Sequence, residues 1–261
     1  MMFKLKSQVI FLVCLLLSSV IAQALIHEKV SRTFTSNDGR EITAQLEGYN
    51  QISKEVTLRI GSGQKHDLHI DLFSRQDQAF ILEWHQDYIA SFVHVDFFTN
   101  RIDCGRIVFM LDSSGSMTGD RWEKMVRNMV EVIKRMDKHA KFNIILFGSN
   151  ARVFSPDLIV ANEEFKLEAG RWLRSMQPDG GTNLLSAIKA ARSMRKTEVY
   201  AILSDGYPSG EIMDIYDAIT DNRRANGRMI RVFGVSYQSS ARGQEFMEEL
   251  SDRFGGNYSR R

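Results

Sequence analysis

An unbroken apolar run that ends in an aspartate and two serines constrains the fold of this chain more than any other stretch. Residues Ile107 to Leu111 are all apolar, and Asp112, Ser114 and Ser116 follow at alternate positions. A continuous apolar run is typical of a parallel strand that is buried on both faces. Open parallel sheets bind their ligands outside the carboxyl ends of their strands. We therefore expect the three polar side chains to lie at such an end.

Strand-like and helix-like patterns alternate from about residue 103 to residue 261. Further strands are expected at 142–147, 151–154, 199–203, 230–235 and 257–259, and helices at 122–136, 164–175, 184–194, 212–226 and 244–254. The strands at 142–147 and 151–154 are close enough to form a hairpin with an antiparallel edge. Strands that alternate with helices predict a doubly wound α/β fold, with a mostly parallel sheet flanked by helices.

The polar residues at the strand ends suit a metal ion. One carboxylate and two hydroxyls, from Asp112, Ser114 and Ser116, are hard oxygen donors, which Mg²⁺ prefers. Three donors do not complete an octahedron. Thr182 follows two glycines, which can take conformations that other residues avoid, and Asp205 ends another apolar strand. The sequence therefore predicts one divalent cation site to which three loops contribute.

These five residues resemble the metal-ion-dependent adhesion site of von Willebrand factor type A domains, whose pattern is Asp-x-Ser-x-Ser, then Thr, then Asp. The resemblance implies that Ser114, Ser116 and Thr182 contact the metal directly, and that Asp112 and Asp205 hold it mostly through water. Neutral hydroxyls leave much of the charge of the ion uncancelled, so it can accept an Asp or Glu carboxylate from a partner protein. The implied cation is Mg²⁺, with Mn²⁺ and Ca²⁺ as alternatives.

Three functions are open to such a site: a metal-dependent binding module, a scaffold whose metal only stabilises the domain, and a hydrolase that uses the metal as a Lewis acid. A hydrolase needs a general base or a positioned nucleophile, and the loops that carry the motif contain no His, Cys or Lys. The Asp112 loop also lacks the second aspartate of aspartyl-phosphate hydrolases, and no Walker-type loop is present. The sequence therefore favours a non-enzymatic adhesion or scaffolding protein.

The first 24 residues have the features of a secretory signal peptide. Lys4 and Lys6 precede an apolar stretch at 9–17, and Ala22-Gln23-Ala24 fits a cleavage site before Leu25. The apolar stretch is too short for a comfortable membrane span. We expect an exported protein, periplasmic or secreted, with no stable membrane span after cleavage. A membrane tether formed by an uncleaved N-terminal segment is the alternative.

Charge and cysteine content exclude two further classes of protein. Without Lys4 and Lys6, the 34 basic residues become 32, which equals the 32 acidic residues. A neutral chain without a long basic run gives no reason to expect a nucleic-acid partner. Removal of the signal peptide leaves Cys104 as the one cysteine, so no internal disulfide framework can form. We expect this thiol to be inert and partly buried.

Between residues 31 and 86 the pattern changes to short strands separated by turns. Apolar and polar residues alternate at 41–46, 55–60 and 66–72, with turn signals at 37–40 and 61–63. Three or more such strands predict a small barrel, and a short helix at 76–86 would end this first domain. His66 and His69 lie on opposite faces of the last strand and no cysteine accompanies them, so they do not predict a zinc site.

This region resembles the Sla-homology domain, a small SH3-like barrel whose copies recur in exported bacterial proteins. The resemblance rests on Arg32-Thr33-Phe34, Asp38-Gly39-Arg40, Ala44, Val56-Thr57-Leu58 and Leu72–Gln78. It implies an interaction or spacer module. Residues 92–98 fit either an added edge strand or a packed connection. The predicted domains are a signal peptide at 1–24, a barrel at 25–86, a connection at 87–102 and a von Willebrand factor type A domain at 103–261.

Overall fold

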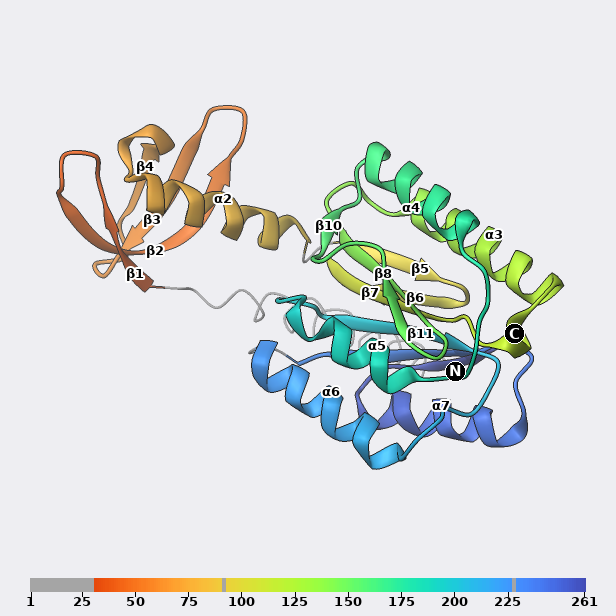
Figure 1. Ribbon diagram of the computed structural model, residues 1–261. Coiled ribbons are helices and arrows are strands. Elements are labelled where there is room, and N and C mark those ends of the chain that lie inside the picture. The colour runs from red at the N-terminus through yellow and green to blue at the C-terminus, as the bar shows by residue number, and fades with distance from the viewer. Residues whose placement is uncertain (1–30, 91–92, 227–228) are drawn as a thin grey trace, which may run out of the picture. The chain divides into compact units, whose positions relative to one another are not determined.

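The computed structural model describes residues 31–90, 93–226 and 229–261 (Figure 1). The chain divides into two compact units, Met1–Ser91 and Phe92–Arg261. The signal peptide predicted at 1–24 lies outside the described residues. None of the helices in the described ranges combines the length and the apolar character that crossing a membrane requires.

The first unit is an antiparallel sheet followed by a long helix. Its elements are β1 (Ser31–Thr35), β2 (Glu41–Asn50), β3 (Glu55–Ile60), β4 (Lys65–His69), the 3₁₀ helix η1 (Ile70–Leu72) and α2 (Arg75–Ala90). The four strands pair in chain order. Phe34, Val56 and Leu58 are fully buried and pack in one core with Ile81 of α2. The alternating strands predicted in this region are therefore present.

The sheet of the first unit does not show a closed barrel. Strands β1 and β4 are its two edges, and a single bridge between Ser36 and Phe73 joins the chain after β1 to the chain after η1. The SH3-like barrel thus stays a prediction. The strand expected at 66–72 is too long, because its last three residues form η1, which the backbone N–H of Phe73 closes on the carbonyl of Ile70.

The second unit is a mostly parallel sheet with helices on both faces (Figure 1). Strands β8, β7, β11, β12 and β13 are parallel in that order, and β9 and β10 pair antiparallel with β8. The strands are β7 (Arg106–Asp112), β8 (Lys141–Phe147), β9 (Ala151–Val153), β10 (Ile159–Val160), β11 (Val199–Ser204), β12 (Arg231–Ser236) and β13 (Tyr258–Arg260). The helices are α3 (Asp120–Arg135), α4 (Glu163–Ser175), α5 (Leu184–Ala190), α6 (Ile212–Asn226) and α7 (Ala241–Arg253). The predicted α/β fold is confirmed.

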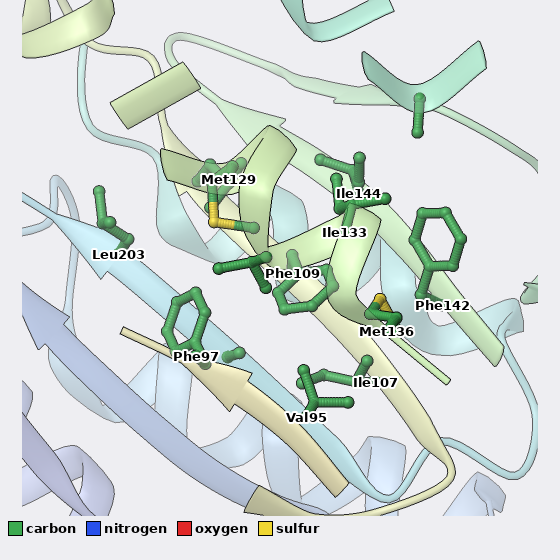
Figure 2. Packing of buried hydrophobic residues seen from close by; sticks show 14 of the residues in the cluster. Val95, Phe97, Ile107, Phe109, Met129, Ile133, Met136, Phe142, Ile144 and Leu203 are labelled. Carbon is green, nitrogen blue, oxygen red and sulfur yellow. The ribbon is translucent and has the colours of Figure 1, made fainter. Parts of the chain in front are cut away.

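Strand β7 lies inside this sheet and is buried on both faces. Ile107, Phe109 and Leu111 belong to the core that α3 and α4 cover (Figure 2). Val108 and Met110 belong to the core that α5, α6 and α7 cover. All five side chains are fully buried. The apolar run is unbroken because each of its residues faces a core.

A hairpin precedes β7 and is part of the same core. It consists of β5 (His94–Phe97) and β6 (Asn100–Asp103), which pair antiparallel with each other and not with the main sheet. Phe97 is fully buried, and its ring centroid lies 5.6 Å from that of Phe109 (Figure 2). The amide of Asn100 donates to the hydroxyl of Ser259 at 3.1 Å.

The hairpin replaces the connection that the sequence places at 87–102. Helix α2 continues to Ala90, and the residues from His94 to Asp103 belong to the second unit. Because β5 pairs only with β6 among the described strands, the predicted stretch does not add an edge strand to the main sheet. Its apolar residues Val95 and Phe97 alternate because one face of the hairpin packs against the core, whereas the other face is exposed.

We predict that Phe97→Ala lowers the free energy of unfolding of the second unit by about 3–5 kcal/mol, because deletion of a buried ring leaves a cavity. Urea denaturation followed by circular dichroism measures the change. Ile52→Ala is the control: this side chain is 96% exposed in the first unit, and its removal should change stability by less than about 0.5 kcal/mol. An unchanged unfolding transition in Phe97→Ala would show that the hairpin is not part of this core.

Candidate functional site

The predicted metal donors lie where two neighbouring parallel strands end. Asp112 is the last residue of β7, and Asp205 directly follows β11, which pairs with β7. Ser114 and Ser116 lie on the segment that leads from β7 to α3, where Ser114 precedes and Ser116 belongs to the short 3₁₀ helix η2 (Gly115–Met117). Both aspartates are buried, and Ser116 is exposed. The site is therefore a cluster of two buried carboxylates with one exposed serine beside it.

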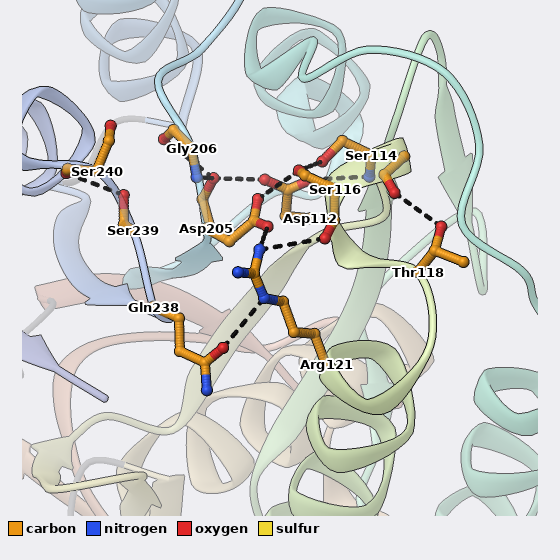
Figure 3. A network of polar contacts seen from close by, with 12 residues as sticks. Asp112, Ser114, Ser116, Thr118, Arg121, Asp205, Gly206, Gln238, Ser239 and Ser240 are labelled. Carbon is orange, nitrogen blue, oxygen red and sulfur yellow. Dashed lines mark hydrogen bonds and ion pairs between the residues drawn. The ribbon is translucent and has the colours of Figure 1, made fainter.

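A chain of hydrogen bonds joins four of the five predicted residues (Figure 3). The backbone N–H of Ser114 donates to Oδ1 of Asp112 at 2.8 Å. The hydroxyl oxygens of Ser114 and Ser116 are 3.0 Å apart. The hydroxyl of Ser116 then donates to Oδ1 of Asp205 at 2.8 Å. The Asp-x-Ser-x-Ser spacing thus turns the side chains of one loop toward the aspartate of the next strand.

Thr182 lies beside this network without joining it. The backbone N–H of Ser209 donates to the carbonyl of Thr182 at 2.8 Å. A Cβ placed on Gly206, the neighbour of Asp205, would lie 4.0 Å from Oγ1 of Thr182. Within the described residues, the Thr182 hydroxyl makes no hydrogen bond to the other four side chains. The structure therefore places the Thr182 hydroxyl near Gly206, the residue that follows Asp205.

Gly180 allows the Thr182 loop to contact the serine loop. Its φ is +65°, and a Cβ at this position would lie 1.8 Å from the hydroxyl oxygen of Ser149. Its carbonyl accepts a hydrogen bond from the backbone N–H of Gly115 at 3.0 Å. A residue with a side chain would disfavour this backbone conformation and collide with Ser149.

The Asp112 carboxylate is in an unfavourable electrostatic environment. Its pKa is raised from 3.8 to about 6: burial is the main cause and the nearby Asp205 carboxylate adds to it, although hydrogen bonds from Ser114 and Ser204 act in the opposite direction. A raised pKa means that the folded protein disfavours the charged form of this carboxyl group. A bound cation would relieve this penalty, because it would attract both carboxylates.

Three residues at the site carry little or no signal in the sequence. Ser204 donates a hydrogen bond to Oδ2 of Asp112. Arg121, in the first turn of α3, donates from Nη1 to Oδ2 of Asp205 at 2.9 Å. Its Nε donates to the side-chain oxygen of Gln238 at 3.0 Å. Ser204 could have been found as the polar end of an apolar strand, whereas nothing in the sequence connects Gln238 with Arg121.

The donor chemistry fits a hard divalent cation. Three hydroxyls and two carboxylates are all oxygen ligands, which Mg²⁺, Mn²⁺ and Ca²⁺ accept. In the part of the chain that the structure describes, no group of three or more His, Cys, Asp or Glu side chains is placed to hold a metal. A cation at this site would thus depend on its hydroxyl donors, and His66 and His69 belong to no such group.

Comparison with known proteins assigns the second unit to a family. Residues 105–260, more than half of the chain, match the family model of the von Willebrand factor type A domain. The chain belongs to this family. We call the second unit the A domain. A solved von Willebrand factor type A protein from Catenulispora acidiphila is similar with a TM-score of 0.51 and 18% identity, over 62% of this chain and 39% of that one, which supports the fold alone.

Two human proteins illustrate the sequence similarity. Inter-alpha-trypsin inhibitor heavy chain H2 is 34% identical over 85 residues, which are 33% of this chain and 9% of that protein. The von Willebrand factor A domain-containing protein 3B is 26% identical over 157 residues, 60% of this chain and 12% of that protein. This chain therefore matches only a small part of their length. Domains of this family are typically protein-interaction modules, are often metal-dependent and are generally not enzymes.

We predict that Mg²⁺ raises the melting temperature of the full chain, because a ligand that binds only the folded state stabilises it. Ser116→Ala should reduce the rise, since it removes one donor, and Asp112→Asn should abolish it. Differential scanning calorimetry over a series of Mg²⁺ concentrations after EDTA treatment measures the effect. Ser193→Ala removes an exposed hydroxyl in the 3₁₀ helix that follows α5 and should behave like the wild type. An equal rise in all variants would place the metal elsewhere.

In the presence of EDTA, we predict that Asp112→Asn raises the free energy of unfolding at pH 7.5 by about 1–3 kcal/mol. The folded pKa of about 6 lies above the unfolded value near 3.8, so the folded protein binds more protons between these values. The charged Asp112 carboxylate therefore destabilises the folded protein fully at pH values above its folded-state pKa. This destabilisation disappears at pH values below its unfolded-state pKa. Urea denaturation should show the gain at pH 7.5 and lose it near pH 4. A variant that is less stable than the wild type at pH 7.5 contradicts this account.

Proposed function

We propose that the A domain binds a partner protein by coordinating one of its Asp or Glu carboxylates to a divalent cation. The observation that carries this proposal is the convergence of Asp112, Ser114, Ser116 and Asp205 in one hydrogen-bonded network, with Thr182 beside it. These side chains come from three loops that lie far apart in the sequence. Chance polar residues at strand ends would not be expected to meet in this way.

The charges of the donors explain why the ion would attract an acidic partner. In the proposed site, the hydroxyls of Ser114, Ser116 and Thr182 contact the ion, while the two aspartates hold it mostly through water. Hydroxyls are neutral, so they cancel none of the ionic charge. Ser116 is exposed, and an ion that contacts it would be within reach of a partner. We propose Mg²⁺ as the cation, with Mn²⁺ and Ca²⁺ as alternatives.

We propose binding rather than catalysis. Metal-assisted hydrolysis requires a group that accepts a proton from water. The Asp112 and Asp205 carboxylates already accept hydrogen bonds from Ser114, Ser204, Ser116 and Arg121, and in the proposed site they hold the ion. The other ionisable side chain at the site is that of Arg121, and a guanidinium group stays protonated in proteins and cannot act as a general base. The generally non-enzymatic character of related A domains supports the same conclusion.

For the rest of the chain, we propose export and a second interaction module. The charged start, the apolar stretch at 9–17 and Ala22-Gln23-Ala24 support a signal peptide. The bridge between Ser36 and Phe73 supports a Sla-homology-like fold for the first unit, since it brings together the two ends that a barrel would join.

The proposal is tested by affinity capture with the purified full chain and exported proteins of the native host. We expect a partner that is retained in Mg²⁺, released by EDTA and retained again when Mg²⁺ is restored. Asp112→Ala should not retain it under any of these conditions, because the metal site is lost. Substitution of the partner's acidic residues would then identify the carboxylate that binds.

Asp120→Ala is the matched control for this capture. Asp120 is an exposed acidic residue at the start of α3, and within the described residues its side chain has no hydrogen bond or ion pair with the hydrogen-bonded network. Its removal changes the net charge as Asp112→Ala does, and capture should persist. If the partner is retained by Asp112→Ala and in EDTA, the metal is structural and recognition lies on another surface, such as the first unit.

A further inference from the structure

Arg121 brings a positive charge into direct contact with the candidate metal site. Its Nη1 donates to Oδ2 of Asp205 at 2.9 Å and to the backbone carbonyl of Ser116 at 3.3 Å (Figure 3). The Asp205 side chain is almost completely buried, whereas 39% of the Arg121 side chain is exposed. The ion pair therefore lies at the boundary between the buried aspartates and solvent, on the side where a partner would approach.

The guanidinium group is held from a second direction by Gln238. Nε of Arg121 donates to the side-chain oxygen of Gln238 at 3.0 Å. Gln238 has a φ of +51°, a conformation that residues other than glycine rarely adopt. Its backbone N–H donates to the carbonyl of Arg261 at 2.8 Å, which fixes the loop after β12. Nη2 of Arg121 makes no hydrogen bond within the described residues (Figure 3).

The contact with Arg121 leaves one oxygen of Asp205 for the metal site. Oδ2 accepts from Arg121, and Oδ1 accepts from Ser116 on the side of the donor hydroxyls. A cation held among Ser114, Ser116 and Thr182 would thus be held by Oδ1, through water, and need not displace the arginine. The arginine can stay bound to Asp205 in the metal-loaded domain.

We propose that Arg121 sets the net charge of the metal site, so that it weakens binding of the divalent cation and strengthens binding of an acidic partner to the loaded site. This inference rests on the proposed function. Asp112 and Asp205 supply two negative charges, and Arg121 cancels one of them. A divalent cation then leaves the loaded site with one positive charge, whereas without the arginine the loaded site is neutral. A carboxylate binds more strongly to the positively charged site.

Binding of Mg²⁺ alone tests the first half of the inference. Isothermal titration calorimetry on the full chain should show about tenfold tighter binding to Arg121→Met than to the wild type, because a repelling charge is removed. Arg121→Lys keeps the charge and should stay within about twofold of the wild type. Arg127→Met, at an exposed arginine on the same helix, makes the same change in net charge and should not alter binding. Unchanged or weaker binding to Arg121→Met overturns the inference.

Binding of acetate to the Mn²⁺-loaded full chain tests the second half. Acetate should displace water from the ion and lower the relaxation rate of water protons. Arg121→Met should require about tenfold more acetate than the wild type, Arg121→Lys and Arg127→Met, because its loaded site is neutral. Gln238→Ala releases Nε of Arg121 and should shift both measurements in the same direction by a smaller factor.

The two measurements separate failure of this inference from failure of the proposed function. If acetate displaces water equally well from the wild type and from Arg121→Met, the inference is wrong and the binding function stands. If acetate displaces no water from the wild type, the proposed carboxylate binding is wrong, and with it the second half of the inference. Circular dichroism of each variant verifies that it is folded. Arg121→Lys behaving like Arg121→Met would contradict the role of charge, since only the geometry would then matter.

Discussion

Burial of β7 on both faces is the constraint on which the rest of the A domain depends. Its five apolar residues fill two separate cores, so the strand has no face on which a polar side chain could reach water. After the apolar run, the first polar side chain is Asp112, at the carboxyl end of the strand. The neighbouring strand β11 is buried in the same way and leads to Asp205. The two carboxylates meet at one edge because β7 and β11 are parallel neighbours whose apolar runs end there.

The burial of the two aspartates also makes it unfavourable for both to be charged at the same time. Water cannot screen their charges well, and the raised pKa of Asp112 reflects both its burial and the proximity of Asp205. Serine hydroxyls and the N–H of Ser114 offset part of this penalty. Arg121 neutralises Asp205 from the solvent side. In this site, a few hydrogen-bond donors and one guanidinium group offset part of the charge of two buried carboxylates. A divalent cation would offset more of that charge than any of these side chains does.

Most of the A domain could be predicted because its signals are local. The run from Ile107 to Leu111 identifies a buried strand, and the polar residues after it identify the edge where a site forms. The hairpin at 94–103 was not predictable. Its alternating apolar residues indicate that one face packs, but they do not identify the surface on which it packs. The end of β4 was missed because apolar and polar residues go on alternating through Leu72, and three residues are too few to distinguish the period of a 3₁₀ helix from that of a strand. Arg121 and Gln238 are 117 positions apart, and only the fold brings them together.

The contact between Asn100 and Ser259 spans 159 positions of the sequence. It connects the hairpin that precedes β7 with β13, which forms one edge of the main sheet. During synthesis on a ribosome, the hairpin is made early, whereas Ser259 is added only after almost the whole A domain has been made. Phe97 has its ring partner Phe109 much sooner, since the two lie close together in the sequence. The apolar side of the hairpin can therefore pack early in synthesis, whereas its hydrogen bond to β13 forms only when the A domain is almost complete.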